Sequence, residues 1–414
     1  MYTVLFWIII AILFLDFALE QVLDRLNGKN VSVQLPDEVC NIYDADKYKK
    51  QQEYFKTNQK LGNVSDVFSF IVIMLMFFLF GFAFVDEIAR GLSQNSLIIS
   101  LLFFGFLYFA NEILSLPFSV YKTFVIEEKF GFNKTTKKTF ALDTVKSWLM
   151  TIVLGGVVLT LLMLFYEKVG QDFWIIAWGI LALINIFMLM FYSNLIVPMF
   201  NKQTPLPDGE LRTEIEKFCR NVGYQIENLY VIDGSKRSTK ANAYFTGLGS
   251  KKRIVLYDTL MDTLTTEEIV AVLAHEIGHY KHKHTRTMLL ISLLNIGVMF
   301  YLLSLALGSP TEGNIHIANA LGSQIPSFHF GVIVFGILYA PISMLLGIGV
   351  NVLSRKNEYQ ADTFAKNNGL AKPLGEALKK LSVSSLSNLN PHPAYVFFHY
   401  SHPTLLQRLR NLNS

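Results

Sequence analysis

Charged residues and cysteines are scarce in this chain of 414 residues. Asp, Glu, Lys and Arg make up only 16% of it. The net charge of +4 comes with no basic run interleaved with aromatic residues, which argues against a nucleic-acid partner. The two cysteines, Cys40 and Cys219, lie far apart and in no metal-ligand spacing. They indicate thiols in a reducing compartment and not a disulfide framework.

Hydrophobic residues, by contrast, make up 52% of the chain, and the mean hydropathy of +0.37 is typical of a membrane protein. Apolar runs of about 17 residues or more are long enough to cross a bilayer as helices. We expect seven spans, at residues 2–19, 67–85, 97–118, 148–166, 173–200, 288–307 and 331–353. The first run has no positive residue before it and no small-residue cleavage site after it, so we expect a retained span and not a signal peptide.

Basic residues alternate between the loops that join these spans. The loops after the first and third spans are rich in them: Arg25, Lys29, Lys47, Lys49, Lys50, Lys56 and Lys60, then Lys122, Lys129, Lys134, Lys137, Lys138 and Lys146. The loop after the second span holds only Arg90, and the loop after the fourth holds only Lys168. The loop after the sixth span holds no Lys or Arg. Because cytoplasmic loops carry an excess of Lys and Arg, we expect an outside or lumenal N-terminus and a cytoplasmic C-terminus.

The spans divide the chain into four parts. Residues 1–200 hold spans one to five with their cytoplasmic loops, and 201–287 form a soluble cytoplasmic insert. Residues 288–353 hold spans six and seven, and 354–414 form a cytoplasmic C-terminal segment. The predicted fold class is an all-α polytopic membrane protein with a small α+β cytoplasmic insert.

The insert contains the sequence with the strongest chemical signal. Its first part predicts a helix and three short strands, at 211–222, 228–232, 241–246 and 253–257. Thr265 and Glu268 then form a capping-box pattern that starts a second helix. On that helix His275 and His279 are four residues apart and share one face, with Glu276 beside them. This His-Glu-x-x-His pattern predicts two zinc ligands and a base.

A catalytic zinc ion takes three protein ligands and leaves a position open for water. Glu358 and Asp362 follow the seventh span, and at a separation of four residues they share a helix face. Glu358 can complete a two-His, one-Glu site, and Asp362 can accept the other ring N–H of a ligand histidine. Alone, this pair is more typical of a solvated helix face. Gly278, inside the motif helix, costs about 1 kcal/mol relative to Ala and indicates close packing there.

Five separated segments carry a resemblance to a known family. They are FVIEEKFGFN at 124–133, STKANAYFTG at 238–247, AHEIGH at 274–279, NEYQAD at 357–362 and HYSHPTL at 399–405. Together they resemble the type I CaaX prenyl proteases, which are seven-span integral-membrane zinc metalloproteases. The resemblance covers nearly the whole chain. It implies that the helices enclose a large chamber within the membrane, with a zinc site on its cytoplasmic side.

The resemblance also implies roles for particular residues. It implies one Zn²⁺ per chain, held by His275, His279 and Glu358. Glu276 would then be the general base that takes a proton from the attacking water and delivers it to the leaving amine. The physical chemistry of a two-His, one-Glu site agrees with these roles.

Substrate contacts are less specific. The resemblance matches Asn242 and His402 to positions that contact the substrate backbone, and His402 could donate to the developing oxyanion. Taken alone, a histidine before a proline is as typical of a turn as of a catalytic site. Arg408 could support His402, meet the terminal carboxylate of a peptide, or form a surface salt bridge. The strand at 241–246 could hold a peptide by strand addition or could be an ordinary hairpin.

Several other polar residues leave alternatives open. Glu112, within a span, is expected either to pair two helices or to face a water-filled cavity. His282 and His284 are expected to cap or solvate the end of the motif helix. His316 and His329 are expected to be bystanders on the far side of the membrane.

We therefore expect a zinc endopeptidase that removes the last three residues of prenylated CaaX proteins or peptides, acting as a monomer in the bilayer. The membrane would be that of the endoplasmic reticulum or a bacterial inner membrane. One alternative has the same chemistry without a prenyl requirement, in the quality control of membrane proteins. A less favoured alternative is a zinc transporter or sensor, with His275, His279, His282 and His284 as a metal cluster. Glu276 argues against it, because transport needs no base at that position.

Overall fold

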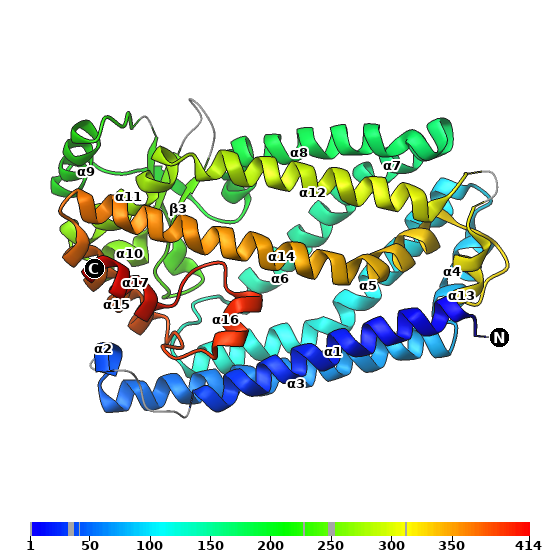
Figure 1. Ribbon diagram of the computed structural model, residues 1–414, viewed down its shortest axis with the longest axis horizontal. Helices are drawn as coiled ribbons and strands as arrows, with labels where there is room; N and C mark the ends of the chain where they lie inside the picture. The colour runs from blue at the N-terminus through cyan, green and yellow to red at the C-terminus, as the bar shows by residue number, and fades with distance from the viewer. Residues whose placement is uncertain (1, 32–36, 41, 227, 247–252, 311–312) are drawn as a thin grey trace.

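The computed structural model describes residues 2–31, 37–40, 42–226, 228–246, 253–310 and 313–414. Long helices run side by side along the greater part of the molecule (Figure 1). Six helical stretches among these residues are long and apolar enough to cross a membrane. They are α1 (Val4–Asn30), α3 (Ala45–Phe78), α5 (Ser96–Tyr121) with its π-helical continuation η1 (Lys122–Glu127), the stretch Lys137–Met199, α12 (His284–Leu307) and α14 (Phe328–Asn367).

The stretch Lys137–Met199 contains two crossings. It comprises α6 (Lys137–Met150), η2 (Thr151–Gly155), α7 (Gly156–Val169), η3 (Gly170–Asp172), α8 (Phe173–Leu195) and η4 (Val197–Met199). The chain turns at η3, where Gly170 has φ +70°, a conformation that glycine adopts at little cost. Helices α7 and α8 then pack against each other. The expected spans at 148–166 and 173–200 lie on either side of this turn. Each of the seven expected spans falls on helical residues, although the span expected at 67–85 crosses the end of α3 at Phe78 and a left-handed break at Phe80.

Polar side chains within the spans join helices or line cavities. Trp148 Nε1 of α6 donates a 2.7 Å hydrogen bond to Glu112 Oε2 of α5, so Glu112 pairs two helices. Asn111, its neighbour, lines a cavity of about 610 Å³ between α1, α3 and α5, together with Asp16, Glu20 and Asp66. A second cavity, of about 450 Å³, lies between α12 and α14. The region of the spans therefore contains two cavities whose walls combine polar and apolar side chains.

The insert forms a small α+β unit at one end of the helices (Figure 1). Its strands β1 (Gln203–Pro205), β2 (Leu229–Ile232), β3 (Ala243–Thr246) and β4 (Arg253–Tyr257) form one sheet in the order β1-β2-β4-β3. The β2–β4 pair is parallel, and the two outer pairs are antiparallel. The expected helix and three strands are confirmed, whereas β1 was not expected. Because β3 is an outer strand, one of its edges is not paired within the sheet.

An apolar core joins this sheet to the motif helix. The helices of the insert are α9 (Glu210–Asn221), the short α10 (Asp258–Thr263) and α11 (Thr266–Lys281), and η5 (Gly234–Lys236) follows β2. Ile215 of α9, Leu256 of β4 and Ile277 of α11 belong to one buried cluster. Burial of each such side chain stabilises the fold by roughly 1.5–3 kcal/mol. Packing against the sheet therefore fixes the position of α11.

The remaining short helices lie near the ends of the molecule, apart from α16 (Pro393–His399), which packs between α1 and α14. Helices α4 (Gly81–Leu92) and α13 (Ile315–Ala320) lie at the end with the N-terminus (Figure 1). Helices α15 (Ala371–Ser384), α16 and α17 (Leu405–Asn413) follow α14, and α2 (Asp37–Cys40) precedes α3. Helices α15 and α17 pack against each other and against α14, so the C-terminal segment lies beside the motif helix.

Candidate metal centre and active site

Helix α11 is fixed at its start by the expected capping box. Thr265 accepts a hydrogen bond from the backbone N–H of Glu268, and the Glu268 carboxylate accepts one from the N–H of Thr265 at 2.8 Å. Glu268 also pairs with Lys380 of α15 at 2.7 Å. The helix continues without interruption to Lys281, so His275 and His279 lie one turn apart on the same face.

Gly278 lets a second helix approach this face. A Cβ atom at Gly278 would lie 2.9 Å from the Cα of Ala361 in α14. Such a distance is too short for any side chain, so the predicted close packing at Gly278 is confirmed. Ala361 lies between Glu358 and Asp362, and the contact brings both carboxylates beside the histidines.

Three potential ligands converge at this contact. His275 Nε2 and His279 Nε2 are 3.1 Å apart. Glu358 places Oε2 3.3 Å from His275 Nε2 and Oε1 3.2 Å from His279 Nε2. In the described part of the chain, these residues form a group of His and Glu ligands whose atoms all lie within 4.8 Å of one another. The carboxylate of Glu358 is buried, and its Oε2 accepts no hydrogen bond from the described residues. A buried carboxylate oxygen of this kind fits a bound cation.

Asp362 and Arg408 hold His275 from the other side. His275 Nδ1 lies 2.8 Å from Asp362 Oδ1. Arg408 of α17 donates to both oxygens of Asp362, through Nη2 at 2.6 Å and Nε at 2.9 Å. Burial and the charge of Arg408 lower the pKa of His275, but the nearby carboxylates of Asp362 and Glu358 outweigh both and raise this pKa overall. Arg408 therefore contacts Asp362, and the structure does not place it against His402.

His284 is a residue that the sequence interpretation missed. It was expected to cap or solvate the helix end, but only 6% of its surface is exposed. Its Nδ1 lies 2.9 Å from His279 Nδ1. His282, by contrast, is exposed and stacks on the ring of His284 at 5.4 Å. Sequence periodicity places His284 beyond the motif helix, and no signal in the sequence points it back toward His279.

His402 and Asn242 are the two predicted substrate contacts. His402 Nε2 lies 3.3 Å from Glu358 Oε1, and 63% of its side chain is exposed. Arg355 of α14 donates to the carbonyl of Tyr400, and this bond holds the turn that carries His402. Asn242 is exposed just before β3, and its Oδ1 accepts from the N–H of Ala243. The half-buried Glu276 lies between the two candidate ligand histidines along α11.

Another buried cluster has the composition of a serine-hydrolase triad. Ser100 Oγ lies 2.9 Å from His329 Nδ1, and His329 Nε2 lies 2.9 Å from Asp86 Oδ1. Arg90 pairs with Asp86 at 2.8 Å and also donates to Ser327. Ser100 is only 2% exposed, so no substrate reaches its hydroxyl. His329 was expected to be a bystander, and the structure instead uses it to join α4, α5 and α14.

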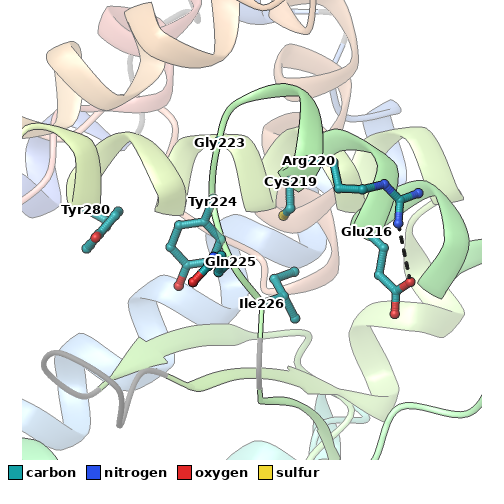
Figure 2. Close-up of a pocket in the computed structure, with 8 residues that line it drawn as sticks. All are labelled: Glu216, Cys219, Arg220, Gly223, Tyr224, Gln225, Ile226 and Tyr280. Atoms are coloured by element: carbon teal, nitrogen blue, oxygen red, sulfur yellow. Dashed lines mark ion pairs between the residues drawn. The ribbon is translucent and has the colours of Figure 1, made fainter.

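The insert also contains a cavity of about 690 Å³ away from the ligand residues (Figure 2). Tyr224, Tyr280 and Cys219 line it, and Glu216 and Arg220, which form an ion pair, line it as well. Burial raises the pKa of the Cys219 thiol to about 12, so this thiol stays protonated and is a poor nucleophile. The cavity includes none of the residues that converge on Glu358.

Comparisons with known proteins agree with this geometry. The family model "CAAX prenyl protease N-terminal, five membrane helices" matches residues 25–202, and that of peptidase family M48 matches 205–414. A CAAX prenyl protease 1 of Saccharomyces cerevisiae is 39% identical over 76% of this chain and 72% of its own length. A CAAX prenyl protease 1 homolog of Arabidopsis thaliana is 38% identical over 77% of this chain and 74% of its own.

A solved structure extends the agreement to the whole fold. The crystal structure of S. mikatae Ste24p superimposes with a TM-score of 0.93 at 32% identity and covers 100% of both chains. The membrane helices, the insert and the C-terminal segment therefore all have counterparts in one known protein. This chain is a membrane-embedded metallopeptidase that belongs to peptidase family M48, and it shares that family's CAAX prenyl protease architecture.

Proposed function

We propose that this protein is a zinc endopeptidase that removes the last three residues from prenylated CaaX proteins or peptides. The observation that carries the proposal is the convergence of His275 Nε2, His279 Nε2 and the Glu358 carboxylate beside Glu276. Two imidazoles and one carboxylate are a ligand set typical of catalytic zinc. The names of the relatives supply the substrate class.

Each residue around the three ligands has a distinct task in this proposal. A bound zinc ion would supply a Lewis acid that makes water a better nucleophile near neutral pH. Glu276 takes the proton from the attacking water and later delivers it to the leaving amine. Asp362, held by Arg408, accepts the Nδ1 proton of His275 and leaves Nε2 facing Glu358.

Two features position the peptide. His402 has an exposed ring close to Glu358 and can donate to the oxyanion that develops on the scissile carbonyl, a contribution of about 3 kcal/mol to transition-state binding. The outer strand β3 has an edge next to Asn242 that pairs with no other described strand, and an extended peptide can add to it as a further strand. Backbone pairing of this kind accepts varied side chains, which suits a protease with many clients.

The proposal includes an orientation. Residues 201–287 and 354–414 would lie in the cytoplasm and the N-terminus outside or in the lumen, because the basic loops lie on one side. The membrane would be that of the endoplasmic reticulum or a bacterial inner membrane, and the protein would act as a monomer. Family membership favours a peptidase over a zinc transporter.

The test is cleavage of a farnesylated peptide with a CaaX terminus by the purified full-length protein, with release of the tripeptide followed by mass spectrometry. We expect cleavage after the prenylated cysteine, and the unprenylated peptide should be a far poorer substrate. Equal cleavage of both peptides would instead support a quality-control protease without a prenyl requirement. Activity that persists in the Glu276→Ala variant would contradict the mechanism.

A further inference from the structure

The two ligand histidines each have a partner on the ring nitrogen that faces away from Glu358. For His275 the partner is Asp362, as described above. For His279 the partner is another histidine, His284, which belongs to the next helix, α12. A group on the far nitrogen of a metal-binding histidine fixes its tautomer and its ring orientation.

The contact continues from His284 to a third helix. His279 Nδ1 lies 2.9 Å from His284 Nδ1, and His284 Nε2 lies 2.8 Å from the side-chain oxygen of Gln360. Gln360 lies on α14, two residues after Glu358. The chain of contacts therefore starts at one ligand and ends on the helix that carries another.

Only one arrangement of protons satisfies every atom in this chain of contacts. His279 needs a lone pair on Nε2 to bind a cation, so its ring proton is on Nδ1. That proton is donated to Nδ1 of His284, which must then carry its own proton on Nε2. This second proton is donated to the amide oxygen of Gln360, an acceptor only. The Gln360 contact thus selects the tautomer of His284, and His284 selects that of His279.

The backbone is shaped to place His284 there. Lys283, between α11 and α12, has φ +60°, a left-handed conformation that residues with a side chain rarely adopt. This residue separates α11 from α12, and His284 begins α12 with its Nδ1 2.9 Å from Nδ1 of His279. The ring of His284 is buried, with the ring of His282 stacked on it at an interplanar angle of 12°.

We propose that His284 is a positioning residue for the metal centre: with Gln360, it holds His279 in the Nδ1-protonated tautomer and in the ring orientation that metal binding requires. The inference rests on the proposed metal site and deepens it. His284 itself contacts neither Glu276 nor Glu358 at hydrogen-bond distance in the described structure, so its effect passes through His279.

The test is the affinity of the purified full-length protein for Zn²⁺, measured by competition with a chromophoric chelator and without any peptide. We expect His284→Ala to weaken binding about 10- to 100-fold, as the loss of such a partner does at other metal sites. His284→Asn, whose side chain has an acceptor and a donor, should recover most of the loss. His282→Ala is the matched control, because His282 is exposed and adjacent, and its affinity should stay within about threefold of wild type.

The outcomes separate this inference from the proposed function. Unchanged affinity in His284→Ala would overturn the inference, as would an equal loss in His282→Ala. If His284→Ala does not fold, Gln360→Ala provides the second measurement, and an affinity equal to wild type there would overturn the inference as well. Failure of the wild-type chain to bind Zn²⁺ would instead contradict the proposed metal site itself. Zinc binding without cleavage of prenylated peptide would contradict only the proposed substrate.

Discussion

Gly278 and Ala361 bring two helices to near backbone contact at the candidate metal centre, since a Cβ on Gly278 would lie 2.9 Å from the Cα of Ala361. We expect Gly278→Ala to push α14 away from α11 and to separate Glu358 from the histidines. Overpacking of this kind costs about 1–3 kcal/mol. Both the midpoint of thermal unfolding and the affinity for Zn²⁺ should fall. Gly349→Ala is the control, because a Cβ there meets nothing within 4 Å. If Gly278→Ala has the unfolding midpoint and the Zn²⁺ affinity of wild type, the close approach of the two helices is not needed for stability or for metal binding.

Glu276 should be required for turnover and not for metal binding. We expect Glu276→Gln to lower kcat by roughly 10²–10⁴-fold, because the amide cannot accept a proton at neutral pH. The affinity for Zn²⁺ should remain close to wild type, since the three ligands are unchanged. Glu267→Gln makes the same change at an exposed position in the first turn of the same helix and should leave kcat unaltered. A large loss of metal affinity in Glu276→Gln would assign Glu276 to the ligands instead.

The buried cluster of Asp86, His329 and Ser100 should serve stability alone. We expect His329→Ala to lower the free energy of unfolding by about 3–5 kcal/mol, because it leaves the buried Asp86 without one of its partners. His316→Ala, at an exposed histidine of the same end of the molecule, should have little effect. Ser100→Ala should keep full peptidase activity. Loss of activity in a stably folded Ser100→Ala protein would show that this cluster takes part in catalysis.

The sequence was sufficient for the parts of the fold that depend on local pattern. Seven apolar runs predicted the spans, because a helix must be apolar over the thickness of the bilayer. The capping box at Thr265 located the start of α11, and alternating short patterns located three of the four strands. The start of α11 also placed His275, Glu276 and His279 on a helix, since the spacing of the motif is itself helical.

The sequence was less informative wherever a contact depends on tertiary packing. The pairing of Glu112 with Trp148 stayed undecided, because helix order does not specify which faces meet. The place of His284 depends on a single left-handed residue, Lys283, which periodicity does not detect. Arg408 reaches Asp362 only because α17 packs on α14. Each of these three side chains contacts a residue on another helix, and the sequence alone does not show how the two helices are oriented relative to each other.

Glu268 should make the stability of the insert sensitive to acid. Burial raises the pKa of this carboxyl, but hydrogen bonds from Lys380 and from the backbone of Thr265 outweigh burial and lower its pKa overall. The folded form therefore gains stability above the unfolded pKa of about 4.5, and this gain is lost as the pH falls below it. We expect Glu268→Gln to unfold more readily than wild type at neutral pH, by about 1 kcal/mol, and the difference to narrow below pH 4.5.

Thermal unfolding in detergent between pH 3 and pH 7 measures this difference. Glu376→Gln is the matched control, because Glu376 pairs with Lys379 at an exposed site of α15 where an ion pair contributes little. Its unfolding midpoint should follow that of wild type at every pH. If the unfolding midpoints of Glu268→Gln and wild type differ by the same amount at every pH, the charge of the carboxylate does not contribute. The cap would then act through the geometry of its hydrogen bonds.

Arg408 should act on the metal centre through Asp362 and not on the substrate. Its guanidinium donates two hydrogen bonds to Asp362 and is only 12% exposed. We expect Arg408→Lys to weaken Zn²⁺ binding several-fold, because lysine keeps the charge but loses the paired geometry. Arg410→Lys, at an exposed position of the same helix, is the control.

A direct contact between Arg408 and the terminal carboxylate of the substrate would give a different result. Wild type and Arg408→Lys would each be given a prenylated peptide that ends in a free carboxylate and the same peptide with a terminal amide. We expect the ratio of kcat/KM for the two peptides to be the same in both proteins, because the guanidinium already contacts Asp362 through Nε and Nη2 and lies 3.6 Å from Glu358 through Nη1. A ratio that collapses toward one in Arg408→Lys alone would show that Arg408 binds the substrate carboxylate, and that its pairing with Asp362 opens when substrate arrives.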